Sequence, residues 1–274
     1  MLVPEGYNGV KRYLFSYIEE IVKHLRTAPH CILFLDYDGT LVPICKEPSL
    51  ARLSSDTQKV LKDLSSKPFL SVGVISGRSL GEIRKMVGVR DLFYGGNHGF
   101  EIFFKNRVWT HPELEGFTPR LIKVVRELHS CTRGIKGIIV EDKKFTASIH
   151  YRNVTTQSPS SIRAIITEVL APYPDVFMIA RGKKVYEIRP LVEWDKGKAV
   201  ERLTALLSIK SKLIRIYIGD DQTDEDAFRV LGKDDITIRV GSKKGSRAQY
   251  YCRGSSEVVT FLKMLTDMKV VQGT

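Results

Sequence analysis

The stretch Cys31-Ile-Leu-Phe-Leu-Asp-Tyr-Asp-Gly-Thr40 decides the fold of this 274-residue chain. Its five apolar residues predict a buried strand, which ends in the pattern Asp-x-Asp-Gly-Thr. Core packing gives no reason to place two acids, Asp36 and Asp38, where a buried strand ends. Open α/β sheets bind ligands beyond the carboxyl ends of their strands. We therefore expect a hard cation and a phosphate group to bind at this point.

Helices and strands alternate on both sides of this stretch. Helical spacing of apolar residues, cap residues and apolar runs predict helices at 11–26, 55–64 and 80–87 and strands at 69–75 and 92–95. The alternation resumes with helices at 196–207, 223–230 and 257–268 and strands at 213–218 and 236–240. This order predicts an α/β fold with a Rossmann-like core, a parallel sheet with helices on both faces.

The pattern changes between the two halves of this core. A helix at 120–130, strands at 137–141 and 145–151, a helix at 160–171 and strands at 176–180 and 185–189 predict an α+β module with an antiparallel sheet. We interpret residues 113–192 as a cap segment inserted into a core formed by residues 1–112 and 193–274.

Composition limits the classes of partner. Lys and Arg exceed Asp and Glu by 43 to 31, a net charge of +12 that suits an anionic ligand. The sequence contains no basic run of five or more residues, no RNP-like pattern and no helix-turn-helix spacing, so we expect no nucleic-acid partner. No apolar run is long enough for a membrane span, and the N-terminus has no signal-peptide pattern, so we expect a cytoplasmic protein without a membrane partner. The four cysteines include no Cys-x-x-Cys pair, which argues against zinc ribbons and redox motifs.

Other predicted strand and helix ends carry groups that fit phosphate chemistry. Ser76 follows one strand and offers a hydroxyl to a phosphate oxygen, and Arg78 belongs to the same loop. Lys196 opens a helix, where a cation can neutralise phosphate charge. The acids of 220–226 follow another strand and repel one another unless a cation is present. Mg²⁺ fits this pattern, because one or two carboxylates, waters and a substrate phosphate typically hold it.

Strand alternation in the cap segment predicts a polar face turned toward this site. Residues 145, 147, 149 and 151 are apolar and alternate with Thr146, Ser148, His150 and Arg152. We expect the apolar set to pack on the cap helices. Lys183 and Glu187 complete the predicted polar face with Arg152, as charged donors and acceptors that face the site.

The motifs together resemble the haloacid dehalogenase (HAD) superfamily of phosphatases and, more closely, its trehalose-6-phosphate phosphatases. The resemblance extends over about 31–262. The residues that carry it are 34–40, Ile75-Ser-Gly-Arg78, Gly96-Asn-His-Gly99, Gly182-Lys-Lys-Val-Tyr-Glu-Ile-Arg-Pro190, Trp194-Asp-Lys-Gly-Lys-Ala-Val200 and Gly219-Asp-Asp-Gln-Thr-Asp-Glu-Asp-Ala-Phe228. It implies a HAD core with a C2-type cap, and Mg²⁺-dependent hydrolysis of trehalose 6-phosphate in trehalose biosynthesis.

The resemblance also implies roles for single residues. Asp36 would be the nucleophile that forms an aspartyl-phosphate, and Asp38 the general acid and then base. Ser76 and Lys196 would hold phosphate oxygens, with Lys198 a competitor of Lys196 for that role. The metal site would use Asp36, Asp38 through its carbonyl, and Asp220, with Asp221 and Asp224 as ligands or orienting groups. The residues expected to bind substrate are Arg78, His98, Arg152, Lys183 and Glu187.

Two alternatives stay open. The same chemistry can act on another sugar phosphate, such as sucrose 6-phosphate or glucosyl-glycerol phosphate. A catalytically silent partner of a trehalose-phosphate synthase belongs to another class, and complete motifs argue against it. A synthase also stays open as a partner of an active enzyme.

Overall fold

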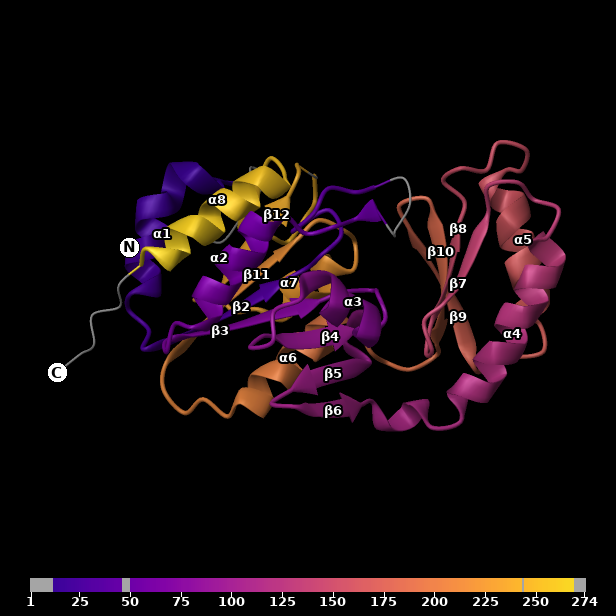
Figure 1. The fold of residues 1–274 in the computed structure, drawn as a ribbon, viewed down its shortest axis with the longest axis horizontal. Helices are drawn as coiled ribbons and strands as arrows, with labels where there is room; N and C mark the ends of the chain where they lie inside the picture. The colour runs from indigo at the N-terminus through magenta and orange to yellow at the C-terminus, as the bar shows by residue number, and fades with distance from the viewer. Residues whose placement is uncertain (1–11, 46–49, 243, 269–274) are drawn as a thin grey trace.

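We describe residues 12–45, 50–242 and 244–268 in a computed structural model of the chain (Figure 1). Two sheets lie side by side in the elongated molecule. The larger sheet has nine strands in the order β1-β13-β12-β11-β2-β3-β4-β5-β6, and the smaller has four in the order β7-β8-β10-β9. The prediction of an α/β core with a separate antiparallel sheet is confirmed.

The larger sheet is parallel from β1 to β4 and antiparallel at the β4–β5–β6 edge. Its strands are β1 (Arg12–Tyr13), β2 (His30–Leu35), β3 (Leu70–Ile75), β4 (Phe93–Gly96), β5 (Glu101–Phe104), β6 (Arg107–Thr110), β11 (Leu213–Gly219), β12 (Ile236–Val240) and β13 (Tyr250–Cys252). Its helices are α1 (Ile18–Leu25), α2 (Ser55–Ser65), α3 (Leu80–Val87), α6 (Lys196–Leu207), α7 (Asp224–Val230) and α8 (Ser255–Thr266).

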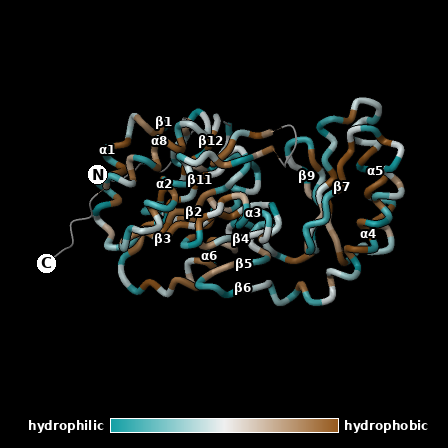
Figure 2. The backbone as a smooth tube through the Cα atoms, in the orientation of Figure 1, coloured by the Kyte–Doolittle hydropathy of each residue, from teal (hydrophilic) through white to brown (hydrophobic). Residues whose placement is uncertain are grey.

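Strand alternation divides the core into two layers, one on each face of this sheet. On β2, Leu33 and Leu35 pack with α1, α2, α3 and α8, whereas Ile32 and Phe34 pack with α6 and α7. Figure 2 shows the apolar colour along β2 and β3, inside the sheet. Because Asp36 continues the alternation of Ile32 and Phe34, it leaves the strand toward the α6 side.

The smaller sheet has its own apolar layer. Its strands β7 (Ile139–Asp142), β8 (Ala147–His150), β9 (Phe177–Gly182) and β10 (Val185–Pro190) pair antiparallel throughout. Helices α4 (Phe117–Thr132) and α5 (Pro159–Leu170) cover the face away from the larger sheet (Figure 1). Ala147, Ile149 and Tyr151 pack under these helices as the alternation predicted, together with Tyr186 and Ile188. Phe145 differs from the prediction, because it packs in a separate cluster with Phe100 and Leu114.

One local prediction differs from the structure, and two elements were not predicted. The helix expected at 11–26 is a short strand at Arg12–Tyr13, a 3-10 turn at Leu14–Tyr17 and then α1, because Arg12 and Tyr13 pair with β13; residue 11 lies outside the described residues. The β5–β6 hairpin escaped prediction because its turn, Lys105-Asn106, has positive φ at both residues without a glycine. Strand β13 was also missed. Among the described residues, no helix is long and apolar enough to cross a membrane.

Candidate active site

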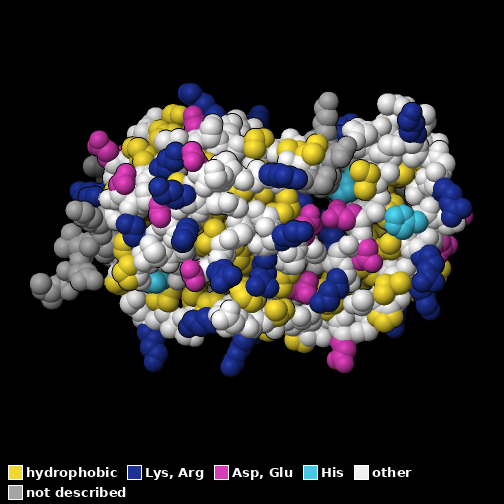
Figure 3. Space-filling model, viewed as in Figure 1, with side chains coloured by type: hydrophobic (Ala, Val, Ile, Leu, Met, Phe, Trp, Pro, Cys, Tyr) yellow, Lys and Arg dark blue, Asp and Glu magenta, His cyan; other side chains and the backbone are white. Residues whose placement is uncertain are grey.

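The carboxyl ends of four adjoining strands meet on the side of the larger sheet that faces the smaller one. Asp36 follows β2, Ser76 follows β3, His98 follows β4, and Asp220 follows β11. They border a cleft of about 390 Å³ between the two sheets. Figure 3 shows acidic and basic side chains gathered where the two parts of the molecule meet. The cleft lining includes Asp36, Asp38, Ser76, Arg78, His98, Arg152, Lys183, Glu187, Lys196, Asp220 and Asp221.

Lys196 joins two of the acids at the floor of this cleft. Asp195 caps the N-terminus of α6 by accepting from the backbone N–H of Lys198, which places Lys196 at the first helical position. The Lys196 Nζ lies 2.7 Å from Asp36 Oδ1 and 2.7 Å from Asp224 Oδ1. Burial alone would lower the pKa of Lys196, but the carboxylates of Asp224 and Asp36 raise it well above its usual value. The ammonium group therefore stays charged.

Lys198, the alternative to Lys196, points elsewhere. Its Nζ lies 2.8 Å from the carboxylate of Glu193, whose side chain is 94% exposed. Lys198 is absent from the cleft lining, whereas Lys196 is 3% exposed and contacts Asp36. The geometry therefore favours Lys196 as the cation beside a bound phosphate.

Asp38 also lines the cleft. Arg78 binds it in a bidentate manner, with Nε 2.7 Å from Oδ2 and Nη2 2.7 Å from Oδ1. Arg78 also forms an ion pair with Glu82 on α3. The guanidinium of Arg78 is 5% exposed and pairs with two acids, so its main role in this structure is to orient the carboxylate of Asp38. The Asp38 side chain remains 38% exposed and accessible to a ligand.

Three carboxylates form a pocket that fits a divalent cation. Asp36, Asp220 and Asp224 each place one oxygen within 4.8 Å of the others. Asp220 Oδ1 is buried and lacks a hydrogen-bond partner, an arrangement that a cation would satisfy. Gly39, with φ +93°, leaves room for this group, because a Cβ there would lie 2.4 Å from Asp220 Oδ2. Mg²⁺ suits oxygen donors of this kind.

The other two predicted metal residues stand outside this group of three oxygens. The carboxylate of Asp38 is held by Arg78, and the role of its backbone carbonyl as a ligand stays a prediction. Asp221 lines the cleft, and its backbone N–H donates to Asp224 Oδ2 at 2.8 Å. This bond orients Asp224, which lies beneath the cleft with no exposed surface.

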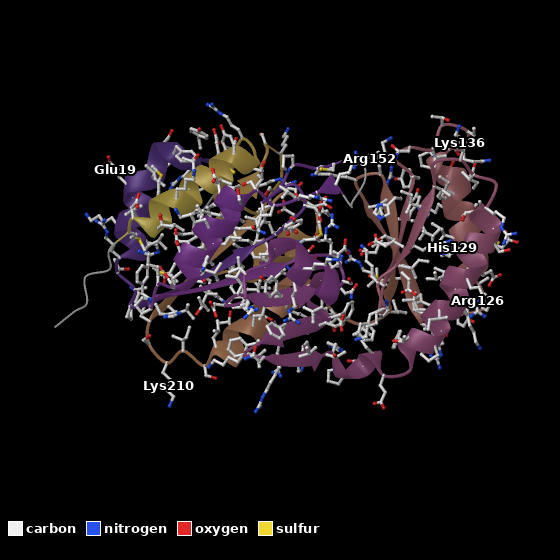
Figure 4. The ribbon with its side chains drawn as sticks, viewed as in Figure 1. Glu19, Arg126, His129, Lys136, Arg152 and Lys210 are labelled. Carbon is white, nitrogen blue, oxygen red and sulfur yellow. The ribbon has the colours of Figure 1, made fainter. Side chains whose placement is uncertain are left out.

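The smaller sheet contributes charged groups to the opposite wall. Glu187 Oε2 lies 2.9 Å from Nε2 of His98, and Arg189 Nε donates to Glu187 Oε2 at 2.6 Å. Lys183 forms an ion pair with Asp220 across the cleft. Arg152 lies at the end of β8 beside the cleft (Figure 4) and donates to the backbone carbonyl of Lys183 at 2.8 Å.

Comparisons with known proteins agree with this geometry. A family model described as trehalose-phosphatase matches residues 34–256, which include every motif around the cleft. The chain belongs to the trehalose-phosphatase family. Trehalose-phosphate phosphatase B of Arabidopsis thaliana is 36% identical over 253 residues, which cover 87% of this chain and 67% of that protein.

Solved structures share the fold of this trehalose-phosphatase family member. The C-terminal domain of a trehalose-6-phosphate phosphatase from C. albicans superposes with a TM-score of 0.81 at 22% identity, covering 95% of this chain and 100% of that one. A sucrose-phosphatase from Synechocystis sp. superposes with a TM-score of 0.54 at 17% identity, covering 87% of this chain and 98% of that one. Phosphatases whose names give different sugars therefore share the architecture, which alone does not distinguish between substrates.

Two residues that connect the two walls of the cleft, Asn97 and Lys143, were not predicted from the sequence. Asn97, fully buried after β4, accepts from Thr146 Oγ1 at 2.8 Å and donates to the backbone carbonyl of Lys143 at 3.0 Å. Lys143 Nζ donates to the carbonyl of Gly77 at 3.0 Å and lines the cleft. The sequence showed a charged turn at 142–144 but carried no signal that this turn lies against the core.

We expect His98 to stay neutral at physiological pH in this family member. Burial lowers its pKa from 6.5 to about 4, and Arg189 adds to this effect while Glu187 opposes it. A histidine whose pKa is lowered by folding contributes stability that is complete above pH 6.5 and decreases as the pH falls toward 4. An NMR titration of the imidazole signal that disappears in His98→Gln measures this pKa. A midpoint near 6.5 would contradict the described burial.

Proposed function

We propose that this protein hydrolyses trehalose 6-phosphate to trehalose and phosphate, with Mg²⁺ as cofactor. The observation that carries the proposal is the cluster of Asp36, Asp220 and Asp224, held together with Lys196 at the floor of the cleft. Membership of the trehalose-phosphatase family supports the substrate. When bound, Mg²⁺ would be held by Asp36, Asp220 and Asp224 and would neutralise charge on the phosphate.

Asp36 and Asp38 have separate tasks in this proposal. A carboxylate oxygen of Asp36 attacks phosphorus, and the bond from phosphorus to the sugar oxygen breaks. Asp38, which has to enter the step protonated and with one oxygen released from Arg78, gives this proton to the departing oxygen and later takes a proton from the water that releases phosphate from Asp36. Arg78 fixes the direction of the Asp38 carboxylate, and the half-exposed position of Asp38 lets it reach both reactants.

The remaining predicted residues would hold the substrate. Lys196 and the Ser76 hydroxyl border the floor of the cleft beside Asp36, where they can bind phosphate oxygens. Lys183, Glu187 and Arg152 stand on the opposite wall as charged donors and acceptors for sugar hydroxyls. His98 and its bond to Glu187 connect this wall to the core.

We also propose that the chain is divided into a HAD core, residues 1–112 and 193–274, and a cap, residues 113–192. The separate four-stranded sheet and its own apolar layer support this division. In Figure 4 the labelled Arg126 and His129 of α4 lie beyond the cap sheet as seen from the larger sheet, and both residues are exposed. The described cap residues that line the cleft come from the strands of its sheet and from the turns beside them.

Phosphate release from a panel of sugar phosphates tests the proposed function. We expect rapid hydrolysis of trehalose 6-phosphate with Mg²⁺, slow hydrolysis of sucrose 6-phosphate and glucosyl-glycerol phosphate, and no activity with excess EDTA. Equal rates across the panel would contradict the trehalose assignment. No turnover of any compound would favour the silent partner of a trehalose-phosphate synthase.

A further inference from the structure

Strand β12, with the sequence Ile236-Thr-Ile-Arg-Val240, contains an arginine within a strand whose residues are all buried. The Arg239 side chain is 6% exposed. Parallel strands inside an α/β sheet are usually apolar, and a buried charge is costly unless it is paired and hydrogen-bonded. The position of Arg239 therefore calls for an explanation from its partners.

The partners of its side chain all belong to residues 220–225, which form the turn after β11 and the start of α7. Arg239 Nη2 donates to the backbone carbonyl of Asp220 at 2.5 Å, and Nη1 donates to the carbonyl of Asp221 at 3.2 Å. Nη1 also lies 2.7 Å from Oε1 of Glu225. In the strand register, Arg239 stands opposite Gly219, the last residue of β11. One guanidinium thus spans the turn from its first residue to the first turn of α7.

This turn carries two of the three carboxylates of the candidate metal site, Asp220 and Asp224. Because the carbonyls of Asp220 and Asp221 point to Arg239, the rotation of the backbone at these two residues is fixed. The turn has little free space, since a Cβ at Gly219 would lie 2.3 Å from Cγ of Asp224. A small rotation of the backbone would therefore move the metal-binding oxygens.

Glu225 compensates the charge of Arg239. Its Oε1 pairs with the guanidinium, and its Oε2 accepts from the backbone N–H of Arg247 at 2.8 Å. Glu225 is 8% exposed, so the ion pair is shielded from water. An unpaired guanidinium this close to the acids would repel a cation. The pair supplies a fixed geometry with little net charge.

We propose that Arg239, held by Glu225, is a positioning residue that sets the metal affinity of the site formed by Asp36, Asp220 and Asp224. The inference rests on the proposed Mg²⁺ site and adds a determinant outside its ligands. Outer partners that orient metal ligands typically change metal affinity by roughly 10- to 100-fold when they are lost. A purely electrostatic role predicts the opposite sign, because removal of a cation would strengthen metal binding.

Titration with Mn²⁺, followed by EPR in the absence of substrate, tests this inference. We expect Arg239→Gln to raise the Mn²⁺ dissociation constant by about 10- to 100-fold and Arg239→Lys, which can bind one carbonyl at a time, to raise it by less. The double variant Arg239→Met/Glu225→Gln removes both charges and keeps an acceptor for the Arg247 N–H. It should recover thermal stability relative to Arg239→Met but not metal affinity.

Arg215→Gln is the matched control. Arg215 lies near the N-terminal end of β11 and pairs with Asp235 at 2.6 Å. The substitution therefore breaks a similar ion pair at a distance from the site. Arg215→Gln should lower the melting temperature. It should change the Mn²⁺ dissociation constant by less than about twofold, which we count as no effect. If Arg215→Gln weakens binding as much as Arg239→Gln, or if the double variant regains wild-type affinity, the role of Arg239 is general stability and the inference is wrong.

The outcomes separate this inference from the proposed function. A wild-type protein that binds Mn²⁺ but does not hydrolyse trehalose 6-phosphate contradicts the function and leaves the role of Arg239 intact. Arg239 variants that bind Mn²⁺ as wild type does, or more tightly, overturn the inference while the function stands. A folded Arg239→Lys variant provides the comparison if Arg239→Gln does not fold. A wild-type protein that binds no Mn²⁺ overturns the inference.

Discussion

Asp36→Asn should abolish phosphate release from trehalose 6-phosphate, with a loss of roughly 10⁴- to 10⁶-fold in kcat. An amide is not a nucleophile toward phosphorus, so no aspartyl-phosphate can form. The fold should survive because Asn has nearly the same shape, and Lys196 keeps its partner Asp224 at 2.7 Å. Removing one of three neighbouring acids also reduces their mutual repulsion, which offsets the lost ion pair.

The control is Asp226→Asn, the same chemical change at another acid of the cleft lining. Asp226 pairs with Arg229 at 3.2 Å and stands outside the group of three acids. We expect it to keep most of the wild-type kcat. Rapid acid quenching followed by mass spectrometry should detect a phosphorylated peptide containing Asp36 in the wild type and none in Asp36→Asn. A near wild-type rate for Asp36→Asn with Mg²⁺ present would refute the nucleophile assignment.

The sequence was sufficient to predict that several candidate site residues would lie close together. Asp36, Ser76 and Asp220 each follow an apolar run, and parallel strands bring their carboxyl ends to one edge of a sheet. Alternation within the cap strands likewise predicted which residues face the cleft, and Glu187 and Tyr186 indeed point to opposite sides. These predictions depend only on local periodicity and on the order of elements.

Contacts between the two sheets could not be predicted in this way. The bond between His98 and Glu187 joins residues 89 positions apart, and it depends on how the cap lies over the core. Asn97 and His98 also adopt positive φ values of 50° and 58°, which non-glycine residues rarely do. Hydrophobic periodicity does not predict the turn that Asn97 and His98 form. The same holds for Arg239, whose partners become evident only when the turn at 220–225 is folded against β12.

Lys196→Met should lower both stability and activity. The substitution leaves Asp36 and Asp224 buried without a cation, and breaking a buried ion pair from one side typically costs about 3–5 kcal/mol of the free energy of unfolding. Loss of a charge that stabilises the transferring phosphate should reduce kcat by about 10²- to 10³-fold. Lys198→Met is the control, because Lys198 pairs with a Glu193 side chain that is 94% exposed. Ion pairs this exposed contribute little to stability because water screens them.

The pH dependence of this loss distinguishes an electrostatic cause from a packing defect. In the wild type, the pKa of Lys196 is raised above 10.5. The contribution of its charge to the free energy of unfolding is therefore complete below pH 10.5 and is lost only as the pH rises through the folded-state pKa. In Lys196→Met the unpaired acids should take up protons more readily, since burial already raises the pKa of Asp36. The stability difference between wild type and variant should therefore narrow as the pH falls from 7 toward 5, and also on addition of Mg²⁺. Chemical denaturation at several pH values measures it, and a difference that is constant with pH would indicate that lost packing, rather than unpaired charge, destabilises the variant.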